Sequence, residues 1–217
     1  MNYSYENYIT IMDYAKSISD VTSFKENNGK NGVILRHDVD IHPEFALKLY
    51  DLEKDNNISS TFFFMVTSHL YNVLSKHNSK IIKEIYDNGF EIGLHFSTCA
   101  YGEYRPDYDY IEEAMKESNI LSSIIGERVS KLSLHCPVEE KGIPLFDNVI
   151  WHKNFVGDSN KKIHEQDIYR MISKSDKEVV YLLIHPIFWS DCESCDIKEE
   201  YVKILYNGVG DDILLEV

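Results

Sequence analysis

The chain has 217 residues, of which 43% are hydrophobic and 12% aromatic, so it can bury one sizeable core and we expect a single domain over 1–217. Its 36 acidic side chains against 22 basic ones give a formal net charge of −14, which repels nucleic-acid phosphates and anionic membrane surfaces. Nucleic acid is therefore not an expected partner.

The N-terminus is polar and lacks the basic start and apolar core of a signal peptide, and no apolar run approaches membrane-spanning length. We therefore expect a cytoplasmic protein that does not insert into membranes. The four cysteines, Cys99, Cys136, Cys192 and Cys195, are then expected to be free thiols or metal ligands. Cys192 and Cys195 have the spacing of zinc ligands, but a single pair favours plain loop thiols.

The first third of the chain contains two helical patterns and two strand-like runs. Apolar residues recur at helical spacing over 5–18, which predicts a lead-in helix followed by a loop to about residue 30. Residues 32–35 (GVIL) predict a buried strand, and Pro43 opens a predicted helix over 43–56. The run SSTFFFMV at 59–66 predicts a second buried strand.

The same alternation of strands and helices continues to the C-terminus. The further predicted elements are helix 78–88, strand 91–96, helix 108–125, strand 131–135, apolar runs 146–151 and 153–157, helix 165–174, strand 178–185, helix 197–206 and strand 213–217. Strands that alternate with helices indicate a parallel sheet, and seven or so strands favour closure into a barrel. We therefore expect an α/β fold of the distorted (β/α)7-type TIM-like barrel class.

Four of the predicted strands end in side chains that can bind metals or transfer protons. These are GVILRHDVD at 32–40, EIGLHF at 91–96, KLSLHCP at 131–137 and VVYLLIHP at 179–186. In parallel α/β proteins, the carboxyl ends of the strands face the active site. The sequence therefore predicts one shared site at this end of the sheet.

The first strand carries two carboxylates. Side chains alternate along a strand, so Arg36, Asp38 and Asp40 share one face if the strand continues through Val39. Two neighbouring carboxylates repel, and the usual remedies are a bound cation, a shared proton or a nearby arginine such as Arg36. The alternative is that Asp40 only caps the helix that begins at Pro43 while Asp38 pairs with Arg36.

Three histidines, His95, His135 and His185, each close an apolar strand. One such histidine is more often a hydrogen-bonded core or rim residue than a ligand. Their coincidence with the two carboxylates favours a shared site. The other histidines expected at the surface are His42, His69, His77, His152 and His164.

The motifs LRHDVDIHPEFAL, SSTFFFMV, GFEIGLHFS and LLIHP resemble the polysaccharide deacetylase family, carbohydrate esterase family 4, over most of 33–190. The resemblance implies a metal-dependent hydrolase that removes an N-acyl group, such as acetyl, from a sugar. It also implies that Asp38 is the general base, Asp40 and His95 are metal ligands and His185 is the general acid. The implied cofactor is a divalent metal, first of all zinc, with cobalt, nickel or iron as alternatives.

The chain departs from the family motifs in two places. Four residues after His95, where the family has a second histidine, this sequence has Cys99. The third metal ligand therefore stays open between His135, Cys99 and water. His135 stands where the family has the arginine of an Arg-x-Pro motif, so it either replaces that arginine or is a ligand. Asp158 loosely matches the aspartate that tunes the catalytic histidine.

We expect a small-molecule or oligosaccharide substrate, for example an N-acylated sugar precursor used in surface polysaccharide biosynthesis. Arg36, Asp158 and Trp189 are predicted to line the substrate site. Trp189 and its neighbour Phe188 follow His185 directly, in a position to stack on a sugar ring. The alternative is that at least one of these rings only packs against the rim of the barrel.

A phosphate on the substrate would need a basic pocket, and Arg36, Arg105 and Lys153 are the candidates for it.

Two other functions remain open. The first is a catalytically weakened carbohydrate-binding or regulatory barrel, which Cys99 at a ligand position motivates. The second is phosphoryl or glycosyl transfer with magnesium or manganese at Asp38-Val-Asp40. Against the second, the sequence has no Gly-rich nucleotide loop, and clustered histidines suit zinc or late first-row metals better than magnesium.

Overall fold

The computed structural model describes residues 1–102, 105, 108–135, 154–191, 199 and 202–204. Its strands form one sheet in the order β5-β4-β3-β2-β7-β6, with β1 paired beside β2, and every pairing is parallel. The strands are β1 (Val21–Thr22), β2 (Gly32–Val39), β3 (Thr61–Phe64), β4 (Glu91–Phe96), β5 (Leu132–Leu134), β6 (Phe155–Gly157) and β7 (Val179–Ile184).

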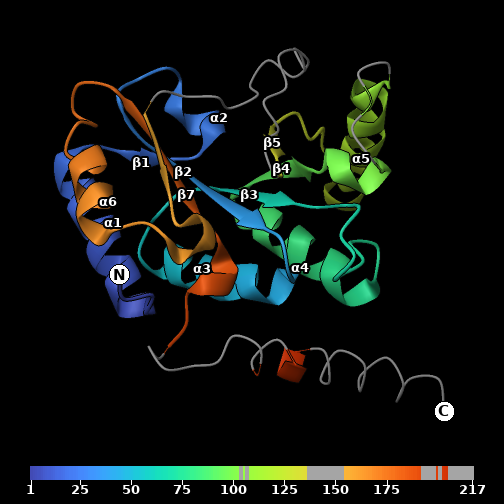
Figure 1. Cartoon of the computed structure of the whole chain (residues 1–217), viewed down its shortest axis with the longest axis horizontal. Coiled ribbons are helices and arrows are strands. Elements are labelled where there is room, and N and C mark those ends of the chain that lie inside the picture. The colour runs from blue at the N-terminus through green and yellow to red at the C-terminus, as the bar shows by residue number, and fades with distance from the viewer. Residues whose placement is uncertain (103–104, 106–107, 136–153, 192–198, 200–201, 205–217) are drawn as a thin grey trace.

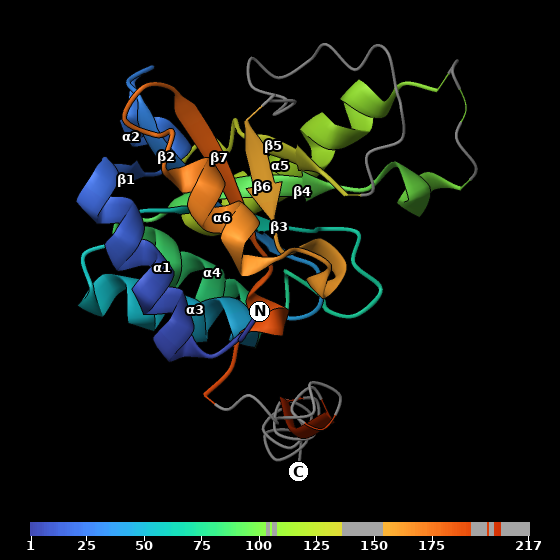
Figure 2. The same cartoon turned by 60° about the vertical axis from the view of Figure 1, so that its left-hand side comes forward.

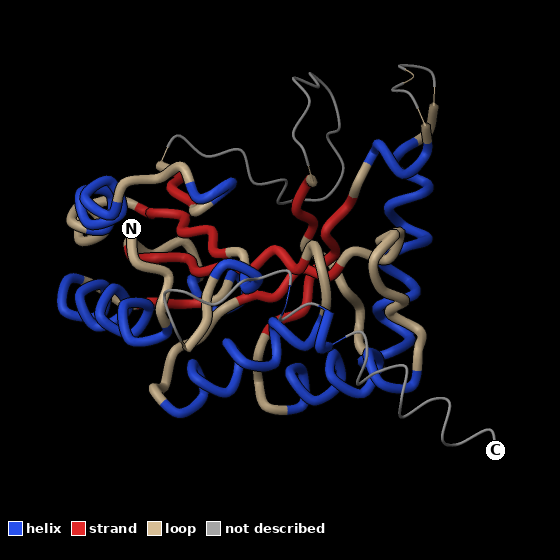
Figure 3. The backbone as a smooth tube through the Cα atoms, turned by 60° about the horizontal axis from the view of Figure 1, so that its bottom comes forward, coloured by secondary structure: helices blue, strands red, loops and turns tan. Residues whose placement is uncertain are grey.

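The helices lie along the outer side of this curved sheet (Figures 1 and 3), except the short α2 (Phe24–Asn27), whose Phe24 packs against Phe63 and Tyr181 on the inner side. They are α1 (Tyr5–Ile18), α2 (Phe24–Asn27), α3 (Pro43–Asp55), α4 (Lys76–Asp87), α5 (Tyr110–Ile125) and α6 (Glu165–Ile172), with short 3-10 turns η1 (Thr98–Tyr101), η2 (Ser159–Lys161) and η3 (Pro186–Phe188). Figure 2 shows α1, α3 and α4 together below the sheet. None of the described helices is long and apolar enough to cross a membrane.

The predicted α/β class, the parallel sheet and the barrel-like curvature are confirmed. In the described part of the chain the sheet is a half-barrel, because its order ends at β5 on one side and β6 on the other. The predicted run 146–151, the strand 213–217, His152, Lys153, Cys136, Cys192 and Cys195 lie outside the described residues, as does most of the predicted helix 197–206.

Strand β2 is the centre of the sheet, and all eight of its residues are buried. It pairs with β7 on one side and with β1 and then β3 on the other. The predicted alternation is confirmed: Arg36 and Asp38 bond to each other on the inner face, while His37 contacts Glu53 of α3 on the outer face. Both faces of β2 are therefore held by polar contacts.

The outer contact belongs to a buried polar cluster around Glu53. Its carboxylate lies 2.7 Å from His37 Nε2 and accepts a 2.6 Å hydrogen bond from Ser60 and another from the Tyr8 hydroxyl. Burial, together with the Glu53 charge, raises the pKa of Tyr8 well above its usual value. Since Tyr8 lies on α1, one side chain of α3 ties α1, β2 and the start of β3 together.

The start of α3 decides between two interpretations of Asp40. The N-cap is His42, whose Nδ1 accepts a hydrogen bond from the Glu44 backbone N–H at 3.3 Å. The hypothesis that Asp40 caps this helix is therefore wrong. The prediction that His42 is a surface group is also wrong, because the ring is half-buried and burial lowers its pKa. His69, His77 and His164 are exposed, as predicted.

A second buried carboxylate, Glu117 of α5, is 2% exposed. Its Oε1 accepts hydrogen bonds from Tyr101 of η1 and from Thr67, whereas its Oε2 is buried and has no hydrogen-bond partner in the described part of the chain. Burial raises the pKa of Glu117 to about 7. The carboxyl group thus changes its charge near neutral pH while it is enclosed by protein.

Removing the Glu53 carboxylate is expected to destabilise the fold strongly. Glu53→Ala leaves the buried polar atoms of Tyr8, His37 and Ser60 without their shared partner, a loss of about 3–5 kcal/mol in the free energy of unfolding. The exposed Glu84 of α4 is the matched control, and Glu84→Ala is expected to change stability by less than about 0.5 kcal/mol. Urea unfolding measures both, and equal stability of the two variants would contradict the structural role.

Glu117→Gln is expected to stabilise the protein at high pH. The folded state holds the Glu117 proton to about pH 7, whereas the unfolded carboxyl loses it near its ordinary value, so ionisation makes folding less favourable as pH rises from about 4.5 to above 7. The amide has no such penalty. Unfolding at pH 5 and pH 8 should show a stability difference between variant and wild type that grows by on the order of 2–3 kcal/mol. A pH-independent difference would refute the assignment.

Candidate metal and catalytic site

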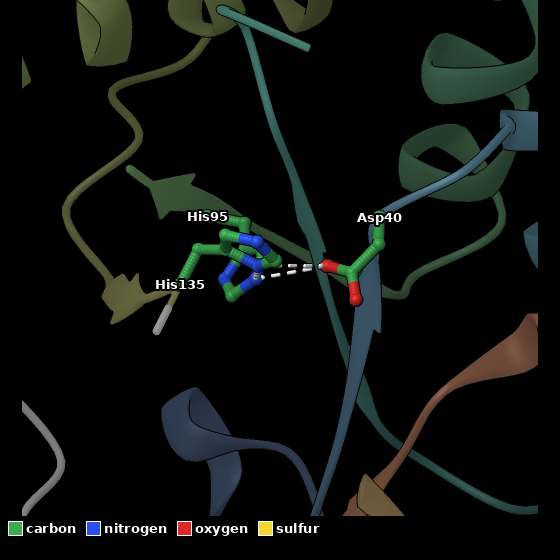
Figure 4. A group of neighbouring side chains, drawn as sticks. All are labelled: Asp40, His95 and His135. Carbon is green, nitrogen blue, oxygen red and sulfur yellow. Dashed lines mark hydrogen bonds and ion pairs between the residues drawn. The ribbon is translucent and has the colours of Figure 1, made fainter. Parts of the chain in front are cut away.

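The carboxyl ends of β2, β4, β5 and β7 bring the predicted site residues together. Asp40 follows β2, His95 lies near the end of β4, and His135 follows β5. These three residues form the one group of potential metal ligands that the described residues contain. In Figure 4 both imidazole rings face the Asp40 carboxylate from across the site.

The spacing of the three ligand atoms fits a single metal ion. Asp40 Oδ1, His95 Nε2 and His135 Nδ1 form a triangle with sides of 3.0, 3.1 and 3.4 Å. Atoms that each bond one ion at about 2.0–2.1 Å lie about 2.8–3.4 Å apart at octahedral to tetrahedral angles. Asp40 Oδ1 is also buried without a hydrogen-bond partner in the described part of the chain, so the donor set fits such an ion.

Of the three candidates for the third ligand, the structure brings His135 into this group. Cys99, in η1, is exposed and does not belong to it. The position of His135 follows from the pairing of β4 with β5, which places Leu134 opposite Phe96.

The charges around Asp40 keep it ionised. Burial acts to raise the pKa of its carboxyl, but the neighbouring imidazoles of His135 and His95 and the charge of His185 outweigh burial and hold that pKa well below its usual range. In return, the Asp40 carboxylate raises the pKa of His135. The site therefore presents a permanent negative charge next to two nitrogen donors.

Asp38 lies under this group and is 2% exposed. Its Oδ2 accepts a 2.7 Å bond from Arg36 Nη2, and the Ser133 hydroxyl lies 3.2 Å from Oδ2 and 3.3 Å from Oδ1. Burial acts to raise the pKa of Asp38, but the Arg36 charge and the charges of His95 and His185 lower it on balance. Asp38 is thus an ionised carboxylate whose Oδ1 makes, among the described residues, one hydrogen-bond contact, at 3.3 Å from the Ser133 hydroxyl.

Arg36 does not line the substrate site, which corrects its predicted role. It is 6% exposed, and besides Asp38 it bonds Ser133 Oγ at 2.7 Å. Its guanidinium lies over the rings of Phe63 and Phe155, with 5.6 and 5.8 Å to their centroids. The glycine of EIGLHF explains the position of Phe63, since a Cβ at Gly93 would come within 2.4 Å of that ring.

His185 is held by Asp158, which is fully buried. Asp158 Oδ1 accepts bonds from His185 Nδ1 at 2.6 Å and from its backbone N–H at 3.0 Å. The other ring nitrogen, His185 Nε2, faces the site and lies 3.8 Å from Asp40 Oδ2. Burial acts to lower the pKa of His185, but the bond to Asp158 and its charge raise it on balance. This geometry agrees with the loose motif match of Asp158 and corrects its predicted contact with substrate.

Trp189 does not stack on a substrate either, because it is 1% exposed. Its Nε1–H donates to Asp158 Oδ2 at 2.8 Å, and its ring packs edge-on against Tyr3 and Tyr8, with 5.3 Å between centroids in both pairs. The indole is buried because the N-terminal helix and the residues before it cover it. Its observed role is to hold the second oxygen of Asp158.

Phe188, the other member of the predicted aromatic pair, is half-buried beside His185, with 5.5 Å between ring centroids. The exposed Lys161 lies over it at 5.5 Å from Nζ to the centroid. Arg105, a candidate for phosphate binding, stacks on Tyr108 at 4.3 Å. No local sequence motif marks Lys161.

Ser133 is not among the predicted site residues, although the strand pattern contains a signal for it. Side chains alternate along a strand, so Ser133 in KLSLHCP shares the inner face with His135 two residues later. In the structure its hydroxyl contacts Arg36, Asp38 and His95.

No family model and no curated protein matches the sequence. The structure is similar to the peptidoglycan deacetylase PdaC from Bacillus subtilis, with a TM-score of 0.53 and 18% identity over 84% of this chain and 86% of that chain. It is also similar to a family 4 acetyl xylan esterase from Clostridium thermocellum solved with a cobalt ion, with a TM-score of 0.51 and 16% identity over 83% of this chain and 84% of that chain.

A third similar structure is a carbohydrate esterase family 4 pseudoenzyme from Bacillus anthracis, with a TM-score of 0.50 and 16% identity over 84% of this chain. This chain spans only 62% of that protein's length. At sequence identities of 16% to 18%, the structural similarity shows a shared fold and nothing finer. The expectation from the four motifs is confirmed at that level: the chain has the fold of the carbohydrate esterase family 4 deacetylases.

Proposed function

We propose that this protein is a metal-dependent hydrolase that removes an N-acyl group, in the first instance acetyl, from a sugar or sugar precursor. The observation that carries the proposal is that three potential metal ligands, a buried carboxylate and an imidazole surround one point. The triangle of Asp40, His95 and His135 lies beside the Arg36-bonded Asp38 and near the Nε2 of His185. The fold likeness to deacetylases supports the same reaction class.

Asp40, His95 and His135 would hold the metal. One carboxylate oxygen and two imidazole nitrogens suit zinc, with cobalt, nickel and iron as alternatives. When bound, such an ion acts as a Lewis acid that polarises the acyl carbonyl and lowers the pKa of a water molecule.

Asp38 and His185 would carry the proton transfers. Asp38, ionised and with Oδ1 engaged in only one long contact, accepts a proton from the water that attacks the acyl carbon. The bond between that carbon and the amide nitrogen then breaks, and the nitrogen takes a proton from His185 Nε2. Asp158 holds the opposite nitrogen of the ring and favours the protonated form that this step requires.

The proposed substrate is an N-acylated sugar, either a small molecule or an oligosaccharide. PdaC is a peptidoglycan deacetylase, which supports a sugar of a surface polysaccharide or of its precursor, and we propose that the chain acts in the cytoplasm on such a precursor. Phe188 beside His185 takes the place of Trp189 as the proposed stacking surface.

The structure weakens both alternative functions. The weakened-barrel hypothesis depended on Cys99 replacing a ligand, but His135 lies where it could provide the third ligand atom. Metal-dependent phosphoryl transfer would use both carboxylates of Asp38-Val-Asp40, yet Asp38 bonds Arg36 and Ser133 and is not part of the ligand group.

Metal binding tests the ligand assignment. Protein purified without added metal and then loaded with zinc or cobalt is expected to hold about one ion per chain, because three donor atoms converge on one point. Asp40→Ala and His135→Ala should each weaken the affinity more than about 100-fold in competition with a chelator. Cys99→Ser is the control and should leave it unchanged. Loss of metal in Cys99→Ser but not in His135→Ala would overturn the assignment.

Acetate release from N-acetylated oligosaccharides tests the reaction. Asp38→Asn and His185→Gln should each lower kcat by about 10²–10⁴-fold with the metal retained, because each removes a proton-transfer group. His69→Ala, at an exposed position, should match wild type. Metal-loaded wild type that binds sugars without releasing acetate would favour the binding barrel, and phosphate release would favour phosphoryl transfer.

A further inference from the structure

We propose that Lys161 is a specificity-determining residue that binds an anionic group, a carboxylate or a phosphate, on the sugar that carries the acyl amide. This inference rests on the proposed function, because it concerns which N-acylated sugars the same site takes. Three observations carry it: the place of Lys161 beside the proposed acid, the surroundings of its ammonium group and its backbone conformation.

Lys161 lies on the side of the site where the proposed leaving group departs. Its Nζ is 5.5 Å from the centroid of the Phe188 ring, and that centroid is 5.5 Å from the centroid of the His185 ring. In the proposed reaction His185 gives a proton to the sugar nitrogen, and Phe188 stacks on the sugar. A substituent on that sugar then lies within reach of the flexible four-carbon stem of the lysine.

The ammonium group of Lys161 is available to an anion. The side chain is exposed, and it forms no ion pair with a carboxylate of the described residues. Its Nζ lies instead over two aromatic rings, at 5.0 Å from the centroid of Tyr3 and 5.5 Å from that of Phe188. An exposed contact between a cation and a ring is weak. An anionic ligand can therefore draw the ammonium group away from the rings at little cost.

The backbone holds Lys161 in this place in an uncommon conformation. Its φ is +54°, in the left-handed region that a lysine rarely adopts. The turn is closed by a 2.8 Å hydrogen bond from the Lys161 N–H to the carbonyl oxygen of Asp158, whose side chain accepts bonds from His185 and Trp189. One turn thus orients the proposed acid and sets the position of the cation. Strained residues of this kind cluster at binding and catalytic sites.

Four N-acetylated sugars test the inference: N-acetylglucosamine, its 1-phosphate, its 6-phosphate and N-acetylmuramic acid, which carries a carboxylate. They offer an anion at three positions of the ring. Zinc-loaded wild type is expected to favour at least one anionic sugar over the uncharged one by about 3–5-fold in kcat/KM, through KM, and less so at high salt. NMR titration of the chain with the same sugars gives the dissociation constants without catalysis.

Lys161→Gln keeps the length of the side chain and removes its charge. It should lose the preference, because KM and the dissociation constant for the anionic sugars rise by about 3–5-fold. Lys161→Arg keeps the charge and should retain the preference. Lys162→Gln is the matched control, because Lys162 is the next residue, is also exposed and lies over no ring among the described residues. This variant should retain the wild-type preference.

The anionic sugar that binds most tightly distinguishes a phosphate from a carboxylate. A wild type that prefers no anionic sugar would overturn the inference, as would a folded Lys161→Gln with the wild-type preference. Acetate release from none of the four sugars by metal-loaded wild type would instead refute the proposed function. The titration would still decide the role of Lys161, because it measures binding alone.

Discussion

The buried ion pair between Arg36 and Asp38 is the interaction on which the rest of the site depends. Burying two charges costs several kcal/mol per ion unless they are paired and their remaining polar atoms are bonded. Here this cost is offset by the hydrogen bond that Arg36 donates to the Ser133 hydroxyl and by the two aromatic rings over which the guanidinium lies. Because Arg36 and Asp38 lie two residues apart on one strand, their pairing needs no other element to align them.

The pairing of Arg36 with Asp38 bears on the role of His135, which follows β5. The resembled family has an arginine where this chain has His135. Here Arg36 of β2 supplies the guanidinium that neutralises Asp38, so the position after β5 is free to provide a nitrogen donor beside Asp40. In the proposed metal site, His135 would thus provide the ligand that the resembled family takes from the second histidine, at the position of Cys99.

Local patterns predicted the strands, the inner face of β2 and the strand-end residues, because alternation and strand exits are encoded within a few residues. The choice between Cys99 and His135 was not predictable in this way, since it depends on the register of β4 against β5. The role of Trp189 was wrongly predicted for a similar reason. Whether its ring meets solvent depends on Tyr3 and Tyr8, which lie about 180 residues earlier in the chain.

His95 and His185 lie at equivalent strand ends, but the groups that contact their rings differ in charge. His95 and His185 both anchor Nδ1 and leave Nε2 toward Asp40. The anchor of His185 is the carboxylate of Asp158, whose charge favours an imidazolium that can give up a proton. Nδ1 of His95 lies instead 3.1 Å from the uncharged hydroxyl of Ser133, which adds no such charge. The proposed acid and the proposed metal ligand therefore differ in the group that contacts Nδ1.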